Sequence, residues 1–343
     1  MMGGVPGALA LATPAAAAPF TLQPAGSVPV PSEARQVALP PAGNQMAVLC
    51  GDQKLRLLSL PAGEVERTVS GERITSFSYS PEGRRLAVGA FSGTVQLMPA
   101  SGSADARKWE AGERRIEVLV FSHDGKILVT GALDRPGKVW NVSGEPELLG
   151  ELRGNFAGVT AAAFSPDDRL LVTAGGDTVI RFYQTDPIKE LARNQDALLE
   201  SLAVEFTRDS RYALVGGVDG VISVLDAATG KAARSLGRQT GLVAMMAAMP
   251  DGRHVAAAYV DSDDMRKPPS IVMWDLHAGT PETISNTRGV LGWGLVKGEF
   301  WIATSRRALA ASAPEPSRSA QRHPSEEHSR SLEEQTVELW RVG

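Results

Sequence analysis

The sequence predicts an all-β protein, a seven-bladed β-propeller made of four-stranded antiparallel sheets. Two observations favour this fold. A short phrase, seen clearly as "FSHDGKILVTGALDRPGKVWNV" from Phe121, recurs along the chain at a nearly constant interval. Short apolar stretches alternate with Gly, Pro and Asp at roughly the 8–12-residue spacing of small strands and turns. No stretch of useful length keeps the apolar period of about 3.6 residues that an amphipathic helix requires.

The repeat is clearest in the turn that follows the first strand of each copy. That turn is written "FSHDG", "FSPDD" and "FTRDS" in the middle copies, and "LPPAG", "YSPEG", "AMPDG" and "LVKGE" in the others. Aligned on their second letter, the seven anchors are Pro40, Ser80, Ser122, Ser165, Thr207, Met249 and Val296, separated by 40, 42, 43, 42, 42 and 47 residues. A period of this length indicates repeated supersecondary units.

Each copy is predicted to hold four strands, ordered from the centre outwards. The small apolar run "VTAAAFS" (159–165) suits an innermost strand, and "RLLVTAG" (169–175) suits a strand covered on both faces. The alternating "GVISVLDA" (220–227) is typical of a third strand, and the more polar "KAARSL" (231–236) suits an exposed edge. Short connections make neighbouring strands antiparallel. One such sheet cannot bury both faces alone, but seven packed radially can.

The third strands of three copies contain a tryptophan near their end, in "KVWNV" (138–142), "VMWDL" (272–276) and "ELWRV" (338–342). With the period, these endings resemble the WD-repeat β-propeller family in a divergent, bacterial-type form. Trp274 and Asp275 make one intact signature dipeptide, and the other two endings carry Asn or Arg in place of Asp. The resemblance covers roughly residues 30–343 and implies the fold. It implies no single function, because the scaffold hosts many unrelated roles.

The last copy ends after its third strand, with "TVELWRVG", so its outer strand is missing. The family resemblance implies that the N-terminal segment around Phe20 to Val30 supplies this strand and closes the ring. The prolines of this segment suit an outermost strand, where the loss of a backbone donor costs little. We therefore expect one propeller domain over residues 20–343.

Members of the resembled family usually carry Gly-His in the connection between blades, with the His bonded to an Asp in the turn between the second and third strands. The Asp is present here in four copies, at Asp52, Asp134, Asp177 and Asp219. The His is absent from every connection. Five connections carry an arginine instead: Arg73, Arg115, Arg153, Arg238 and Arg288.

Two interpretations of these arginines are open. All five would lie on one face, around the channel mouth, where they would attract an acidic peptide or another anionic ligand, since guanidinium groups bind carboxylates and phosphates bidentately. Alternatively, each arginine takes the place of the absent His and pairs locally with the turn Asp or with a neighbour such as Glu72 or Glu113. An exposed pair is worth only about 0–1 kcal/mol, so energetics do not separate the two.

Two insertions break the period, both between the second and third strands of adjacent copies. The first, "DSDDMRKPP" (261–269), contains Asp263 and Asp264 and resembles half of a calcium loop, but it lacks the Gly and terminal Glu that complete one. The second, residues 305–333, contains Arg306 and Arg307 and is predicted to be disordered because it is rich in Ser, Arg, Glu and Pro. In a propeller these turns emerge on the face that carries the connections, so we expect both loops beside the arginines.

The sequence contains no catalytic constellation. Its five histidines are scattered among blades and loops, and only the pair in the second insertion has metal-ligand spacing. No nucleophile elbow or phosphate-binding glycine loop is present. We expect no enzyme activity, no metal and no cofactor. The alternative is a small-ligand, hydrolytic or oxidoreductase site in the central channel, using Glu117 and Glu205 of the predicted innermost strands.

Composition limits the classes of partner. The net charge of −4 argues against a chain that coats nucleic acid or an anionic membrane surface. Cys50 is the single cysteine, so no intramolecular disulfide or cysteine-based metal cluster can form. No apolar run reaches the roughly 18–20 residues that span a bilayer.

The first 19 residues, "MMGGVPGALALATPAAAAP", resemble the later part of a secretory signal, although no Lys or Arg precedes Arg35. Cleavage near Ala17 or Ala18 would predict a periplasmic or secreted protein. An Ala-rich disordered tail would predict a cytoplasmic one, and both interpretations are open.

Together these features predict a non-catalytic scaffold that binds a protein or peptide on the face carrying the connections between blades. The partner would be acidic if the arginines form a ring. The predicted binding residues are Arg73, Arg115, Arg153, Arg238, Arg288, Asp263, Asp264, Arg306 and Arg307. We expect a monomer or one subunit of a complex.

Overall fold

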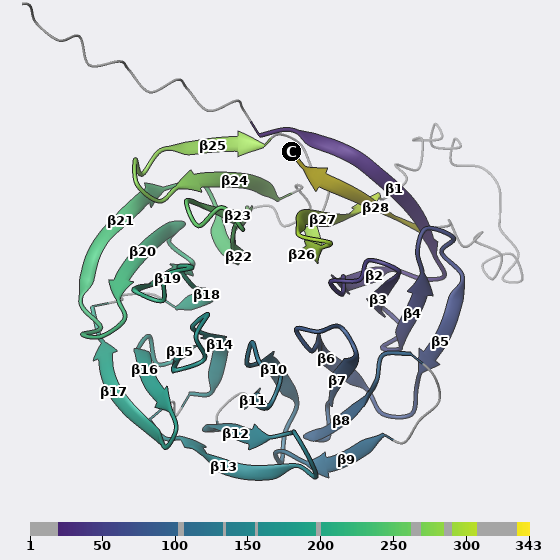
Figure 1. The fold of residues 1–343 in the computed structure, drawn as a ribbon, viewed down its shortest axis with the longest axis horizontal. Coiled ribbons are helices and arrows are strands. Elements are labelled where there is room, and N and C mark those ends of the chain that lie inside the picture. Colours follow the sequence, from purple (N-terminus) through teal and green to yellow (C-terminus); the bar gives the residue numbers. More distant parts are fainter. Residues whose placement is uncertain are drawn as a thin grey trace, which may run out of the picture.

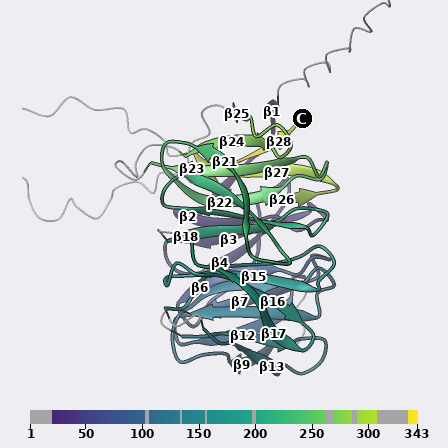
Figure 2. The same ribbon diagram turned by 90° about the vertical axis from the view of Figure 1, so that its left-hand side faces the viewer.

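Seven four-stranded antiparallel sheets are arranged as blades around a central axis (Figure 1). Seen from the side, the ring forms a thick disc (Figure 2). The computed structural model describes residues 20–101, 106–132, 135–154, 157–196, 200–261, 269–284, 290–306 and 335–343. These ranges contain strands and turns and no helix. The predicted fold class and blade number are confirmed.

Every blade has the same four positions from the centre outwards, and blades are numbered here in chain order of their innermost strands. The innermost strands are β2 (Ala34–Ala38), β6 (Ile74–Tyr79), β10 (Ile116–Phe121), β14 (Val159–Phe164), β18 (Ser201–Phe206), β22 (Leu242–Ala248) and β26 (Val290–Val296). The second strands are β3 (Gln45–Cys50), β7 (Arg85–Ala90), β11 (Ile127–Ala132), β15 (Leu170–Gly175), β19 (Tyr212–Gly217), β23 (His254–Val260) and β27 (Glu299–Arg306).

The two outer positions complete each blade. The third strands are β4 (Leu55–Ser59), β8 (Thr94–Pro99), β12 (Gly137–Asn141), β16 (Ile180–Thr185), β20 (Val221–Asp226), β24 (Ser270–Asp275) and β28 (Gln335–Val342). The outermost strands are β5 (Val65–Val69), β9 (Arg107–Glu110), β13 (Glu147–Leu152), β17 (Ile188–Asn194), β21 (Ala232–Arg238), β25 (Pro281–Ile284) and, in blade 7, β1 (Leu22–Val30). Second strands such as β3 are buried throughout, and outermost strands such as β13 are largely exposed, as the polarity of the repeat predicts.

The apolar core is divided into seven clusters, one at each junction between neighbouring blades. At the junction of blades 4 and 5, for example, Val172 and Phe182 of blade 4 pack with Phe206 of blade 5. Among the residues that the structure describes, no cluster belongs to a single blade. Each blade therefore depends on both neighbours for the burial of its faces.

In blades 2 and 5 a glycine near the end of the second strand lies close to the next blade. A Cβ atom on Gly216 would lie 2.4 Å from Cγ1 of Val243 in the next blade, and one on Gly89 would lie 2.7 Å from Cγ2 of Ile116. No other residue type fits there without displacing the next innermost strand. The glycines in "AVGA" and "LVGG" are thus a consequence of blade packing.

Strand β1 closes the ring, as predicted. It pairs antiparallel with β28 from Leu22 to Val30, and beyond the strand Thr21 and Gly343 exchange backbone hydrogen bonds of 3.1 and 3.0 Å. The amide of Phe20 also donates to Oε1 of Glu282 in blade 6 at 3.0 Å. The two ends of the propeller are therefore held side by side (Figure 1).

The predicted start of the second insertion is wrong by two residues. Ser305 and Arg306 belong to β27 and pair with Val337 and Thr336, because β28 is long enough to extend the ladder to them. The signal-like residues 1–19 and positions 307–334 lie outside the described residues. Within the ranges given above, no helix is long and apolar enough to cross a membrane.

The closing strand should contribute strongly to stability. Val28 is fully buried between β28 and blade 1, whereas the adjacent Ser27 is exposed. We expect Val28→Asp to lower the free energy of unfolding by about 3 kcal/mol, because it buries a carboxylate in an apolar cluster. Ser27→Asp should change it by less than about 0.5 kcal/mol. Urea unfolding of the two variants measures the difference, and equal stability would contradict the closing role of β1.

Candidate functional site

The turn between the second and third strands has one construction in blades 1, 4 and 5. Asp52, Asp177 and Asp219 each accept a hydrogen bond from the backbone N–H two residues later, at 3.1–3.2 Å. The residue in between adopts a positive φ in each case. The aspartates are therefore explained by local turn chemistry and need no histidine partner.

In blades 1 and 4 the same aspartate also binds an arginine of the third strand. Arg56 contacts Asp52 at 2.5 Å, and Arg181 contacts Asp177 at 2.7 Å. The hydrogen bond from Arg56 holds the pKa of Asp52 below its usual range. The sequence interpretation missed these two arginines because it considered only the connections, although the spacing "DQKLR" and "DTVIR" was a visible signal.

The tryptophans of the third strands have structural partners on the second strands. The indole N–H of Trp140 donates to Thr130, that of Trp340 to Thr304, and that of Trp274 to the hydroxyl of Tyr259, each at 3.0 Å. These bonds link adjacent strands within a blade. The residues that carry the family resemblance therefore serve the fold.

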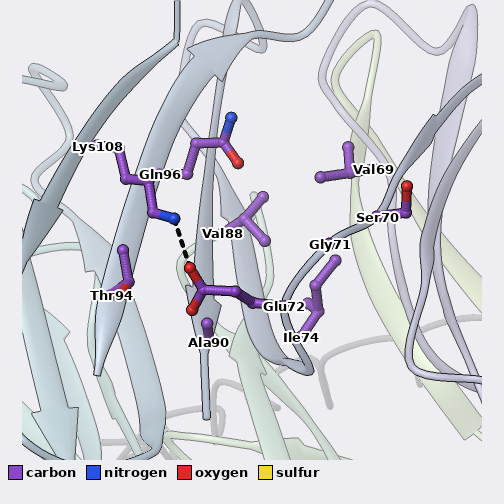
Figure 3. Close-up of a pocket in the computed structure, with 10 residues that line it drawn as sticks. All are labelled: Val69, Ser70, Gly71, Glu72, Ile74, Val88, Ala90, Thr94, Gln96 and Lys108. Atoms are coloured by element: carbon purple, nitrogen blue, oxygen red, sulfur yellow. Dashed lines mark hydrogen bonds and ion pairs between the residues drawn. The ribbon is translucent and has the colours of Figure 1, made fainter. Parts of the chain in front are cut away.

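The connections leave hollows between blades. The hollow between blades 1 and 2, of about 120 Å³, is shown in Figure 3. Glu72 projects into it and binds the ammonium of Lys108 and the hydroxyl of Ser92, and the bond from Lys108 lowers the pKa of Glu72. Similar hollows of about 310 and 290 Å³ lie between blades 2 and 3 and between blades 4 and 5. A charged pair thus occupies the hollow between blades 1 and 2.

The structure brings two of the predicted arginines together. Arg73 and Arg115 line one pocket of about 250 Å³ with Arg35, Gln53 and Phe91. This channel-mouth pocket, defined by those five residues, lies at the connection-face ends of the innermost strands of blades 1 to 3. Sequence reasoning missed Arg35 and Phe91, because each occurs in one copy of the repeat only.

The other predicted residues are not part of this pocket. Arg153, with 88% of its side chain exposed, lies 3.9 Å from Glu151, and Arg238 lines the hollow between blades 4 and 5. Five of the remaining positions lie outside the described residues: Asp134, Asp263, Asp264, Arg288 and Arg307. Arg306 lies in β27, but its side chain is not among those described.

Local pairing holds for only part of the arginine set. Arg115 pairs with Glu117 at 2.8 Å. Glu72 and Glu113, the partners expected from the sequence, bind Lys108 and Arg135 instead. Of the four connection arginines that the structure describes, none contacts an aspartate of a turn.

Two guanidinium groups in the channel-mouth pocket keep their charge unneutralised. Arg73 donates from Nε to Oε1 of Gln53 at 2.8 Å, and its guanidinium lies 4.6 Å from the centre of the Phe91 ring. Neither partner is charged. Arg35 forms no ion pair with any part of the chain that the structure describes. The Phe91 side chain beside them is 48% exposed, which is unusual for a residue of this size.

The innermost strands place two carboxylates near the channel, and these do not form a cluster. Glu117 is engaged by Arg115. Glu205 accepts a hydrogen bond from the N–H of Phe206 at 2.9 Å, and burial raises its pKa to about 7. Within the described ranges no three His, Cys, Asp or Glu side chains lie close enough to hold a metal ion.

Two stretches of the chain match the family model "WD domain, G-beta repeat". They cover residues 63–97 and 146–184. Each WD repeat starts at the outermost strand of one blade and continues through the three inner strands of the next, from β5 to β8 and from β13 to β16. The repeat is thus offset from the blade by one strand. The same offset leaves blade 7 dependent on β1.

Several proteins are similar to this chain in sequence, and two of the three described next are named as WD repeat-containing proteins. Protein tipD of Dictyostelium discoideum is 26% identical over 200 residues, covering 57% of this chain and 30% of that protein. A WD repeat-containing protein 20 homolog of Caenorhabditis elegans is 30% identical over 115 residues, with 33% and 14% covered. A WD repeat-containing protein 26 homolog of Arabidopsis thaliana is 26% identical over 162 residues, with 47% and 28% covered.

The matched stretches span at most 30% of these relatives' length. All three organisms are eukaryotes, so the expected bacterial type finds no support among them.

The two Asp–Arg pairs of the turns should differ in their contribution to stability. Arg181 is only 6% exposed, so Asp177→Ala leaves a buried guanidinium without its main partner and should cost about 2 kcal/mol or more. The pair in blade 1 is more exposed, and Asp52→Ala should cost about 1 kcal/mol or less. Thermal or urea unfolding of both variants provides the comparison. A larger loss for Asp52→Ala would show that burial does not decide the value of these pairs.

Proposed function

We propose that this chain is a non-catalytic protein-binding platform and that its partner contacts the connection face at the channel-mouth pocket. WD-repeat propellers generally bind protein partners, and this chain is similar to several WD-repeat proteins. The chemistry of the pocket supports the same class of function.

One observation carries the proposal: Phe91 is an exposed ring with the guanidinium of Arg73 stacked on it and Arg35 lining the same pocket. Aromatic residues and arginine dominate the energetics of protein interfaces, because they combine a large contact area with directed hydrogen bonds. Since two guanidinium groups here lack an anionic partner, the bound segment is acidic, with carboxylates that pair with Arg35 and Arg73.

The pocket is held in shape by the blades. Arg73 is anchored to Gln53 in the turn of blade 1, and Phe91 belongs to the corresponding turn of blade 2. A partner would therefore meet a site that spans a packed junction and needs little reorganisation. This pre-organisation favours recognition of a short segment.

A site in the central channel is the second candidate, and Glu205 is the observation that favours it. Its raised pKa, about 7, means that a proton could be gained or lost near neutral pH. No second titratable group shares a hydrogen bond with Glu205 among the described side chains. The channel-mouth pocket brings together more groups that could bind a ligand than the surroundings of Glu205 do.

Charge reversal in the pocket tests the proposal. We expect Arg73→Glu to weaken binding of an acidic peptide containing one aromatic residue by about tenfold or more, because it removes one charge-assisted contact and adds a repulsive one. Binding to the wild type should also weaken as salt rises. Fluorescence anisotropy with labelled peptides, together with quantitative pull-down from native lysate, measures both effects.

Arg153→Glu is the matched control, because Arg153 lies on the same face but away from the pocket. Equal losses of peptide affinity in the two variants would mean that the overall charge of the face, and not the channel-mouth pocket, is responsible for the effect. If both variants captured the same partners as the wild type, the proposed binding position would be wrong.

A further inference from the structure

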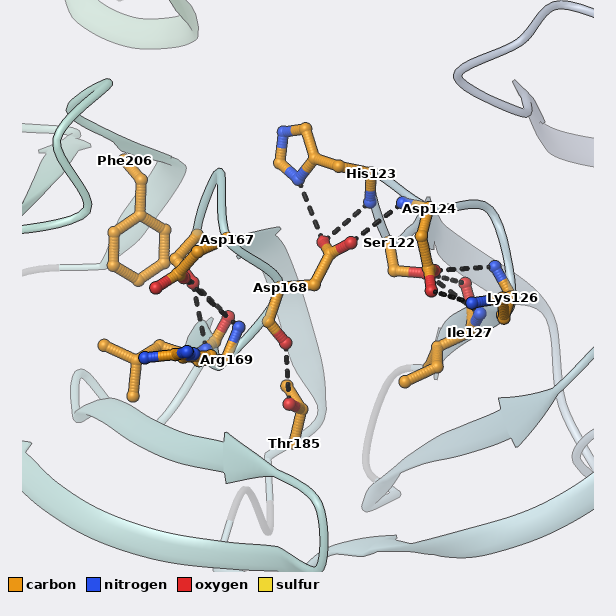
Figure 4. Close-up of polar contacts among 12 residues, drawn as sticks. Ser122, His123, Asp124, Lys126, Ile127, Asp167, Asp168, Arg169, Thr185 and Phe206 are labelled. Atoms are coloured by element: carbon orange, nitrogen blue, oxygen red, sulfur yellow. Dashed lines mark hydrogen bonds and ion pairs between the residues drawn. The ribbon is translucent and has the colours of Figure 1, made fainter.

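The opposite face of the ring carries the turns between the first and second strands. In blades 3 and 4 two of these turns are locked together (Figure 4). The carboxylate of Asp168 accepts hydrogen bonds from the backbone N–H groups of His123 and Asp124, at 2.7 and 2.8 Å, and lies 3.0 Å from Nδ1 of His123. The backbone amides of this turn of blade 3 thus form an oxyanion-binding site, and the Asp168 carboxylate of blade 4 occupies it.

Blade 5 has the corresponding turn, but the described part of the neighbouring blade places no carboxylate beside it. In "FTRDSR" Arg208 and Asp209 take the positions that His123 and Asp124 take in "FSHDGK". Blades 1, 2, 4 and 6 have proline at the first of these positions, which removes one donor: Pro41, Pro81, Pro166 and Pro250. In blade 7 the corresponding N–H, of Lys297, is bonded to the carbonyl of Pro41. Blades 3 and 5 therefore share a donor pair that proline removes in blades 1, 2, 4 and 6 and that a backbone carbonyl engages in blade 7.

The residue that faces this donor pair from blade 6 is Gly252, which corresponds to Asp168 of blade 4. Both adopt a left-handed conformation, with φ of 67° and 57°. A Cβ on Gly252 would lie 3.6 Å from Cβ of Arg208, so it occupies the same place beside the donor turn. It brings no carboxylate. No residue of blade 6 within the described ranges accepts a hydrogen bond from the amides of Arg208 or Asp209.

A groove of about 770 Å³ between blades 5 and 6 opens at this point. Three arginines line it, and each has a neutral hydrogen-bond or ring partner. Nε of Arg208 donates to the carbonyl of Met249 at 3.5 Å, Nη1 of Arg234 donates to the carbonyl of His277 at 3.2 Å, and the guanidinium of Arg211 lies 5.4 Å from the centre of the Tyr212 ring.

None of these three arginines forms an ion pair with a side chain that the structure describes. The one carboxylate lining the groove, Asp209, accepts from the hydroxyl of Thr207 at 2.6 Å and from the N–H of Arg211 at 3.1 Å. Among the residues that line the groove, three arginines therefore face one carboxylate. Glu205, on the innermost strand of the same blade, also interacts electrostatically with Arg208.

We propose that this groove binds a phosphate monoester, whose dianionic group takes the place beside Arg208 and Asp209 that the carboxylate of Asp168 has in blade 3. A phosphate monoester carries about −1.5 to −2 charges at neutral pH and so matches the groove, whereas a carboxylate carries half as much. Arginine pairs bidentately with phosphate oxygens, and backbone amides of a turn donate to them. The volume lies in the usual range of small-molecule sites, about 300–1,000 Å³, and leaves room for the organic part of the ester beside Tyr212 and Leu276.

The site is separate from the channel-mouth pocket, which lies on the other face. Its occupation therefore does not depend on the protein partner proposed above. The ester could be a small metabolite or a phosphorylated side chain, and both present the same chemical group.

Isothermal titration calorimetry in phosphate-free buffer, with O-phospho-L-serine, inorganic phosphate and acetate as probes, tests the proposal. We expect O-phospho-L-serine to bind the wild type at least about tenfold more tightly than acetate, and more tightly than inorganic phosphate. Acetate binding as tightly as the ester would overturn the assignment of phosphate. Inorganic phosphate binding equally well would overturn the assignment of an ester, and no binding of any probe would overturn the site.

Two variants at one position locate the site. Gly252→Asp supplies the carboxylate that blade 4 already has and should weaken binding of O-phospho-L-serine by about tenfold or more. Gly252→Asn has the same size without the charge and should change it by less than about threefold. Both residues tolerate the left-handed conformation, and unchanged melting temperatures confirm the fold. Undiminished binding by Gly252→Asp would show that the phosphate lies elsewhere.

Discussion

The packing of each sheet against two neighbours is the constraint on which the rest of this structure depends. A blade has no core of its own, and all seven apolar clusters form between blades. Close approach explains why the second strands of blades 2, 3 and 5 carry glycine where the next blade touches them, as at Gly216. It also explains why the ring must close, because an open ring would split the cluster between blades 7 and 1 and expose both halves. The pairing of β1 with β28 satisfies that requirement.

The polar contacts at the two faces follow from the same arrangement. On the connection face, hollows lie between adjacent blades, and the charged pair of Glu72 and Lys108 occupies one of them. On the opposite face, short turns of adjacent blades come within hydrogen-bonding distance, so a side chain of one blade can accept from the amides of the preceding blade, as Asp168 does. The two proposed sites lie where a blade departs from this pattern: at Phe91 on one face and at Gly252 on the other.

The structural features that recur in every copy of the repeat could be predicted from the sequence. The anchors from Pro40 to Val296 placed seven innermost strands correctly, and the missing outer strand of the last copy identified β1. The channel-mouth pocket was predicted only in part, since Arg73 and Arg115 were singled out but Arg35 and Phe91 were not. Those two residues occur once each, and their proximity to Arg73 depends on packing between segments far apart in the chain. The contact between Arg181 and Asp177 was missed for a different reason, because an aspartate that caps its own turn was assumed to need a distant partner.

Gln23 and Arg341 of the closing pair are hydrogen-bonded although 318 positions separate them in the chain. On a ribosome, β1 emerges before any blade is complete, and β28 emerges after all the others. The earliest strand must therefore stay unpaired while six blades assemble, and its edge is open to wrong partners during that time. The prolines within β1, which limit strand pairing, protect the nascent chain from such errors as well as suiting the finished rim.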